Sequence, residues 1–158
     1  MNKEIQGLIE DFYEHDYILN EALATSVFLL KNLEKPLLLE GDPGVGKTVL
    51  ARTLARHLGT NLIRLQCYEG LDVGTTIYEW NYQKQLLHIK LFDQEKDKSA
   101  LGEEIFGMDY LLKRPLLKSI SAEKPVVLLI DEIDRADEEF EAYLLELLSY
   151  FQISIPEL

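Results

Sequence analysis

The residues with the clearest chemical meaning lie at positions 41–48, GDPGVGKT, between an apolar run and a leucine- and alanine-rich run. Glycines let backbone N–H groups form a concave nest for anions, and a following helix directs its positive end at the same place. Lys47 adds a mobile cation for phosphate, and Thr48 adds a hydroxyl for Mg²⁺. A glycine turn alone does not require lysine and threonine at this offset, so the pattern predicts a phosphate-binding loop. The expected nucleotide-binding residues of this loop are Gly41, Asp42, Pro43, Gly44, Val45, Gly46, Lys47, Thr48 and Val49.

Two adjacent carboxylates, Asp131 and Glu132, follow a second apolar run, VVLLI. Open α/β sheets bind ligands at the C-terminal ends of their strands, so both carboxylates are expected at that edge. We expect Asp131 to bind the nucleotide's Mg²⁺ and Glu132 to orient and deprotonate an attacking water. Acidic capping of the next helix is the alternative interpretation, and it suits Asp134 and Asp137 better.

Other motifs in the sequence indicate which reaction a protein with this phosphate-binding loop would catalyse. A GTPase would carry an Asn-Lys-x-Asp motif that reads guanine, and the sequence has none. A small-molecule kinase stays open, although the adjacent carboxylates favour water as the phosphoryl acceptor. The sequence therefore predicts ATP hydrolysis, with ATP and Mg²⁺ as cofactors. The alternative is a regulatory module that binds ATP without hydrolysing it.

Composition limits the partners and the compartment. The chain has 158 residues and a formal net charge of −12, opposite to the basic footprint of proteins that bind nucleic acid. Its single cysteine, Cys67, excludes an intrachain disulfide and fits a reducing cytoplasm. Its apolar runs are too short to span a bilayer, and its N-terminus is too acidic for a signal peptide. We therefore expect a cytoplasmic protein without direct nucleic-acid contact or membrane insertion, whose three histidines, His15, His57 and His88, serve packing or surface roles.

Hydrophobic spacing predicts the elements that position these groups in the first half of the chain. Helices are expected near residues 5–13 and at 16–35, with Asp16 as the N-cap of the second. A third helix follows the phosphate-binding loop, with Gly59 at its C′ position. Buried strands are expected at 36–40, just before the loop, and at 61–67.

The second half of the chain alternates strand and helix patterns in the same way. Residues 77–92 are rich in aromatic residues and predict a β-hairpin turning near Gln83 and Lys84, followed by a polar loop at 93–104. Residues 107–121 have a helical pattern that Pro115 either kinks or starts anew. A buried strand is expected at 125–130, and then a helix capped by Asp137. Together these elements predict an α/β three-layer sandwich around a mostly parallel sheet.

Several of these stretches resemble the MoxR group of AAA+ ATPases. They are LLLEGDPGVGKT, RLQCYEGLD, YEWNYQKQLL, LLKRPLL and IDEIDRADEEFEAYLLELLSYFQISIPEL, and they are most similar to the CoxD-like branch of carbon monoxide dehydrogenase maturation ATPases. The resemblance covers nearly the whole chain, and the middle stretches carry the branch assignment. It implies a P-loop NTPase fold and a chaperone-like ATPase that forms a ring, usually a hexamer. It also implies a partner with a von Willebrand factor A domain and a metalloenzyme client.

The resemblance also implies roles for individual residues. The segment YEWNYQKQLLHIK resembles an insertion that faces the ring pore in this group, with Trp80 and Tyr82 as contact residues; a hairpin that only covers the core is the alternative. Gln66 could hold Glu132 inactive until the ring engages, or it could be a polar residue at a strand end. Arg114 and Arg135 are candidates for the arginine that completes a neighbouring subunit's site, or for local ion pairs, and the choice stays open.

Members of the group continue with a sensor strand, a last strand and a helical lid, whereas this sequence ends at Leu158. Residues 1–158 are therefore expected to form the N-terminal part of an AAA+ nucleotide-binding domain. In the group the sensor strand lies between the strand before the loop and the strand before Asp131, so we expect either a gap between residues 36–40 and 125–130 or a different closure of those two strands. We expect the chain alone to hydrolyse ATP barely above background and not to form a stable hexamer.

Overall fold

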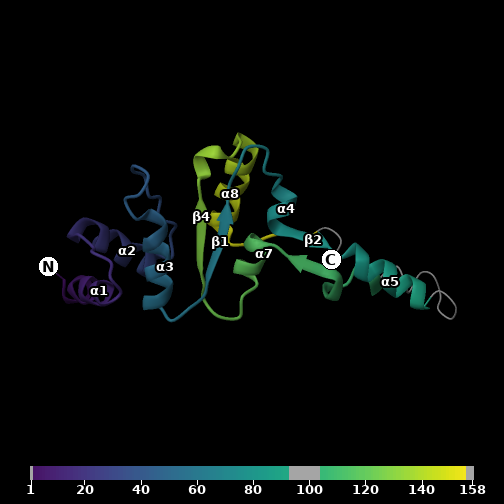
Figure 1. Cartoon of the computed structure of the whole chain (residues 1–158), viewed down its shortest axis with the longest axis horizontal. Coiled ribbons are helices and arrows are strands. Elements are labelled where there is room, and N and C mark those ends of the chain that lie inside the picture. The colour runs from purple at the N-terminus through teal and green to yellow at the C-terminus, as the bar shows by residue number, and fades with distance from the viewer. Residues whose placement is uncertain (1, 93–103, 156–158) are drawn as a thin grey trace. The chain divides into compact units, whose positions relative to one another are not determined.

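The computed structural model describes residues 2–92 and 104–155. Its chain divides into two compact units (Figure 1). Unit 1 contains Met1–Cys67 and Ala122–Ile133, and unit 2 contains Tyr68–Ser121 and Asp134–Leu158. Each unit has a hydrophobic cluster of its own, so each is described by itself.

Unit 1 begins with three helices: α1 (Lys3–Glu14), α2 (Glu21–Leu33) and α3 (Lys47–His57). Helix α1 packs against both α2 and α3. Their apolar faces meet in one cluster, as the helical spacing predicted for α1 and α3. The buried members of this cluster are Leu8, Phe12, Leu19, Ala24, Val27, Leu50 and Leu54.

The second helix starts later than predicted, because Asp16 belongs to the end of α1. Asp16 has a left-handed backbone (φ 59°). The amides of Asp16 and Tyr17 donate to the carbonyls of Tyr13 and Phe12, which is the Schellman pattern of a helix C-terminus. The N-cap of α2 is Asn20, whose side chain accepts from the Leu23 amide at 2.8 Å. By contrast Gly59 is left-handed (φ 60°) just beyond α3, as predicted.

Two strands, β1 (Leu62–Gln66) and β4 (Val127–Asp131), pair in parallel in unit 1. They run side by side in Figure 1, and α3 contacts both. Both strands were predicted from their apolar runs. Their register places Gln66 opposite Asp131, so the C-terminal ends of the two strands lie together.

The strand predicted at residues 36–40 does not form. Leu37 and Leu39 pack against the unit 1 cluster, whereas Leu38 is exposed, so the segment keeps the alternation of a strand. Within the described residues, however, only β1 and β4 form a ladder in unit 1. A strand is defined by its hydrogen-bonded neighbour, and residues 36–40 have none there.

Unit 2 is built around a short antiparallel pair of strands, β2 (Tyr78–Trp80) and β3 (Leu111–Lys113). Its apolar cluster contains Ile77, Trp80, Tyr110, Leu111 and Leu117. Its α-helices are α4 (Val73–Ile77), α5 (Tyr82–Phe92), α7 (Pro115–Ile120) and α8 (Glu138–Tyr150). It also contains the 3₁₀ turns η1 (Met108–Tyr110) and η2 (Ile133–Arg135). The first residue of η2, Ile133, is the last residue of unit 1.

The predicted hairpin at residues 77–92 is wrong, because the strand β2 ends at Trp80 and a helix follows. The Asn81 side chain accepts from the Lys84 amide at 3.0 Å, as an N-cap does. The residues after it are mainly Gln, Lys and Leu, which favour helix. The partner of β2 is β3, much further along the chain.

The predicted helix at residues 107–121 forms only in its second part. Pro115 opens α7, which is one of the two roles predicted for it, but the residues before it form η1 and β3. Asp137 caps α8 as predicted and accepts from the Phe140 amide at 2.9 Å. The predicted polar loop lies outside the described residues except for Glu104. None of the helices described for either unit has the length and apolar character needed to cross a bilayer.

Candidate functional site

The loop before α3 has an open backbone that depends on its glycines. Gly41, Gly44 and Gly46 have φ of 149°, 86° and 94°, which residues with a Cβ rarely adopt. Gly46 is the N-cap of α3 and makes no side-chain capping bond, so no side chain at this position occupies the first amides of the helix. Amides in this position bind anions well, because the helix dipole adds to their partial charge.

Lys47 folds back across this loop. Its Nζ donates to the carbonyl oxygens of Gly41 and Asp42, the latter at 3.0 Å. Both acceptors are neutral main-chain groups, and no salt bridge to Lys47 occurs among the described residues. The ammonium group therefore lies at the loop with its charge uncompensated by a carboxylate, which suits a group that binds phosphate.

Thr48 and Asp131 meet although they are far apart in sequence. Thr48 lies in the first turn of α3, Asp131 is the last residue of β4, and α3 packs against that strand. The Thr48 hydroxyl donates to Asp131 Oδ2 at 3.4 Å, and the Asp131 side chain is 20% exposed. Hydroxyl and carboxylate oxygens are the hard donors that Mg²⁺ prefers, so this pair fits the ion that the sequence predicts.

Glu132 follows Asp131 in an unusual backbone conformation. It is exposed, and its φ of 55° lies in the left-handed region. This conformation costs a residue with a Cβ roughly 1–2 kcal/mol, and such strain often accompanies functional sites. The chain thus turns sharply at the end of β4, directly after Asp131, whose carboxylate accepts from Thr48.

Arg64, which no sequence motif singled out, is central to this arrangement. Arg64 donates to Asp131 Oδ2 from Nε at 3.2 Å and from Nη2 at 2.7 Å. Its Nη2 also donates to Gln66 Oε1 at 2.5 Å. The signal was present in the sequence, since residues i and i+2 of a strand share a face and both side chains are polar.

Tyr17 is a second residue that the sequence analysis did not assign to the site. Its hydroxyl donates to the Gly46 carbonyl at 3.4 Å, and a Cβ at Gly46 would lie 3.5 Å from its ring. Burial raises the pKa of Tyr17 above the ordinary value of a tyrosine, so the hydroxyl stays a neutral donor. Nothing in the sequence around Tyr17 distinguished it from a core aromatic residue.

The other candidates belong to unit 2. Trp80, predicted as a contact residue, is buried and packs edge-on against Phe106 with ring centroids 5.3 Å apart, whereas Tyr82 is 67% exposed. Arg114 pairs with Glu79 at 2.5 Å, and Arg135 lies in η2. These positions give Trp80 a core role and Arg114 a local ion pair.

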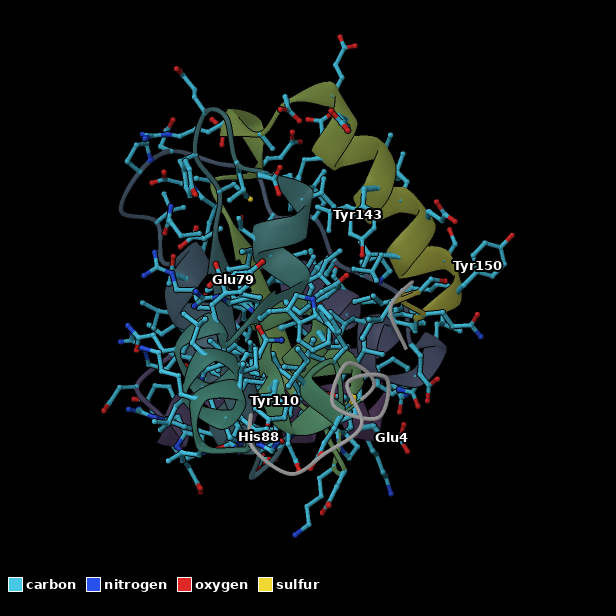
Figure 2. The ribbon with its side chains drawn as sticks, turned by 90° about the vertical axis from the view of Figure 1, so that its right-hand side faces the viewer. Glu4, Glu79, His88, Tyr110, Tyr143 and Tyr150 are labelled. Carbon is cyan, nitrogen blue, oxygen red and sulfur yellow. The ribbon has the colours of Figure 1, made fainter. Side chains whose placement is uncertain are left out.

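The histidines have the packing or surface roles expected of them. His88 on α5 shares a hydrogen bond of 2.5 Å with the Tyr110 hydroxyl, and Figure 2 shows the two side chains together. His57 lies against Phe12, with ring centroids 5.6 Å apart, and His15 is exposed. In residues 2–92 and 104–155, no group of three His, Cys, Asp or Glu side chains could hold a metal ion.

Comparisons with known proteins agree with this geometry. Residues 37–154 match the family described as ATPase family associated with various cellular activities (AAA), which is more than half of the chain. A stretch of 41 residues, 26% of this chain, is 45% identical to midasin from Giardia intestinalis. The chain spans about 1% of the length of that relative. No solved structure matches the chain.

Proposed function

Because the chain belongs to the AAA family, whose members bind and hydrolyse ATP, we propose that residues 41–49 and Asp131 form its nucleotide and magnesium site. One observation carries this proposal. The Thr48 hydroxyl at the end of the loop and the Asp131 carboxylate at the end of β4 meet at 3.4 Å. This is the pairing of hydroxyl and carboxylate that P-loop NTPases use for Mg²⁺ beside a bound triphosphate.

The residues of the site would divide the work as follows. The amides of the glycine loop and of the first turn of α3 bind the phosphate oxygens. Lys47 releases its main-chain carbonyls and places its ammonium on the β- and γ-phosphates. Thr48 and Asp131 hold Mg²⁺, which supplies charge neutralisation on the phosphates when bound. Glu132 would orient a water and accept its proton as that water attacks the γ-phosphorus, while the bond from the γ-phosphorus to the bridging oxygen of the β-phosphate breaks and ADP leaves with that oxygen.

We also propose a finer assignment, to the CoxD-like branch of MoxR ATPases. The motifs RLQCYEGLD and YEWNYQKQLL, at residues 64–72 and 78–87, support it. Under this assignment the protein acts in a cytoplasmic ring ATPase, usually hexameric, that works with a von Willebrand factor A partner. Its ATP hydrolysis drives chaperone-like remodelling or cofactor maturation of a metalloenzyme client.

The replacement Lys47→Ala tests the nucleotide site. We expect it to abolish ADP and ATP binding in titration calorimetry, because it removes a charge-assisted contact to phosphate. The far-UV circular dichroism spectrum should not change, since within residues 2–92 and 104–155 the Lys47 side chain donates to main-chain carbonyls of the loop and holds no other element in place. The matched control is Lys35→Ala, which removes an exposed lysine outside the loop and should bind as the wild type does. Unchanged nucleotide affinity in Lys47→Ala would refute the proposed site.

A further inference from the structure

We propose that Arg64 competes with the divalent cation for Asp131 and thereby limits how strongly Mg²⁺ promotes nucleotide binding. This inference rests on the function proposed above. Arg64 lies on β1, outside both the phosphate-binding loop and the pair Asp131–Glu132. Its contact with one oxygen atom, Asp131 Oδ2, supports the proposal.

Three donors converge on Asp131 Oδ2 in this structure. They are Arg64 Nη2 at 2.7 Å, Arg64 Nε at 3.2 Å and the Thr48 hydroxyl at 3.4 Å. A carboxylate oxygen has two lone pairs, so these donors fill the acceptor capacity of Oδ2. A cation, or a water bound to it, can use this oxygen only when Arg64 withdraws.

Charge makes this exclusion stronger. A guanidinium group stays protonated at any physiological pH. Arg64 and a divalent cation on the same carboxylate would therefore repel each other, and the Asp131 side chain, which is 20% exposed, is screened less by water than a fully exposed carboxylate would be. The repulsion favours one cation at a time on Asp131.

The surroundings allow Arg64, rather than Asp131, to move. The Arg64 side chain is 53% exposed, whereas that of Asp131 is 20% exposed. Arg64 Nη2 already donates to Gln66 Oε1 at 2.5 Å, and Gln66 lies on the same strand. Gln66 therefore offers an acceptor that can keep the guanidinium group close when Asp131 takes a cation.

The consequence is a measurable coupling between Arg64 and Mg²⁺. Without Mg²⁺, the guanidinium charge offsets Asp131 and reduces its repulsion of nucleotide phosphates. With Mg²⁺, part of the binding free energy is spent on displacing Arg64 from Asp131. Both effects reduce the ratio of the ADP dissociation constant in EDTA to that in Mg²⁺, so removal of Arg64 should increase this ratio.

The experiment compares Arg64→Gln with Arg56→Gln by titration of ADP in EDTA and in Mg²⁺. Arg56 is exposed in the last turn of α3, so its replacement makes the same change in net charge away from Asp131. We expect the ratio of dissociation constants to rise roughly three- to tenfold in Arg64→Gln, the range of a partly exposed charged hydrogen bond. It should stay at the wild-type value in Arg56→Gln. Arg64→Lys, which keeps a cation with fewer donors, should give an intermediate ratio.

The outcomes separate this inference from the proposed function. An unchanged ratio in Arg64→Gln would show that Arg64 and the cation do not compete. A lower ratio would show that Arg64 instead holds Asp131 in place for the cation, and it would also overturn the inference. If the wild-type chain binds no nucleotide with or without Mg²⁺, the proposed function fails and the inference fails with it.

Discussion

Glu132 and Arg64 reach the proposed site by different routes. Glu132 adjoins Asp131 at the end of β4, so it needs no long-range contact to lie there, and its place at a strand end could be predicted from the neighbouring residues. The contact of Arg64 with Asp131 depends on the parallel pairing of β1 with β4, which joins distant parts of the chain. The glycine loop was also predictable from neighbouring residues, because the spacing of its glycines and of Lys47 and Thr48 is by itself typical of a phosphate-binding loop.

We predict that, in the assembled ring ATPase proposed above, Glu132→Gln retains nucleotide binding but loses turnover by roughly 10²- to 10⁴-fold, the usual contribution of a positioned general base. The amide keeps the size of the side chain but cannot accept the proton of the attacking water. Phosphate release measures turnover, and calorimetry with ADP and Mg²⁺ measures binding. The matched control is Glu123→Gln, an exposed glutamate of unit 1. A loss smaller than tenfold would assign the general base to another residue.

At the scale of elements, local signals predicted several helix ends correctly, although Asp16 was wrongly expected to cap α2, whose N-cap is Asn20. The apolar spacing of α1, the Asp137 cap of α8 and the Gly59 stop after α3 are all local features, and the structure has all three. The hairpin at residues 77–92 failed because its alternation ends at Trp80 and the partner of β2 comes from residues 111–113. Short apolar runs leave helix and strand undecided until such a partner is known.

The packing of α1 on α3 places His57 in a setting that disfavours its charged form. Burial is the main cause that lowers the pKa of His57, and the nearby positive groups of Lys31 and His15 add to it. Asp11, whose carboxylate lies 3.4 Å from His57 Nδ1, acts in the opposite direction but does not reverse the shift. The folded protein therefore prefers His57 neutral.

This preference predicts a loss of stability on acidification. The unfolded chain titrates with an imidazole pKa of about 6.5 and takes up the proton first, so unfolding is favoured as the pH falls. The stability that the folded state gains from keeping His57 neutral is fully present above about pH 6.5, the pKa in the unfolded chain. It is lost as the pH falls from there to the lower pKa of His57 in the folded protein. We expect the urea unfolding free energy to fall less between about pH 7.5 and about pH 5.5 in His57→Gln than in the wild type. Equal slopes, measured by far-UV circular dichroism, would contradict the prediction.

For the whole molecule, the division into two units is not visible in the sequence. Unit 1 takes Met1–Cys67 and then Ala122–Ile133, because β4 returns to pair with β1. Composition and length cannot reveal such a return, since it depends on which strands pair. All residues of the proposed site belong to unit 1. They are the loop at 41–49, Arg64, Asp131 and Glu132.

This division predicts where a bound nucleotide stabilises the chain. A ligand that binds only the folded state stabilises it by RT ln(1 + [L]/Kd), about 2.7 kcal/mol at 100 times Kd. With ADP and Mg²⁺ at that excess, amides of α3, β1 and β4 that exchange through unfolding of unit 1 should exchange up to roughly 100-fold more slowly. Amides of β2, α5 and α7 in unit 2 should keep their rates, because no residue of the proposed site lies there.

Hydrogen exchange followed by mass spectrometry measures both units in one experiment. Lys47→Ala serves as the control, because it should remove the protection of unit 1 while leaving unit 2 as it was. Trp80, the single tryptophan of the chain, gives an independent optical signal from unit 2. Its urea transition should not shift when ADP and Mg²⁺ are added. Equal protection of both units, together with a shift of the Trp80 transition, would show that the units unfold together, and the nucleotide would then stabilise the chain as one cooperative body.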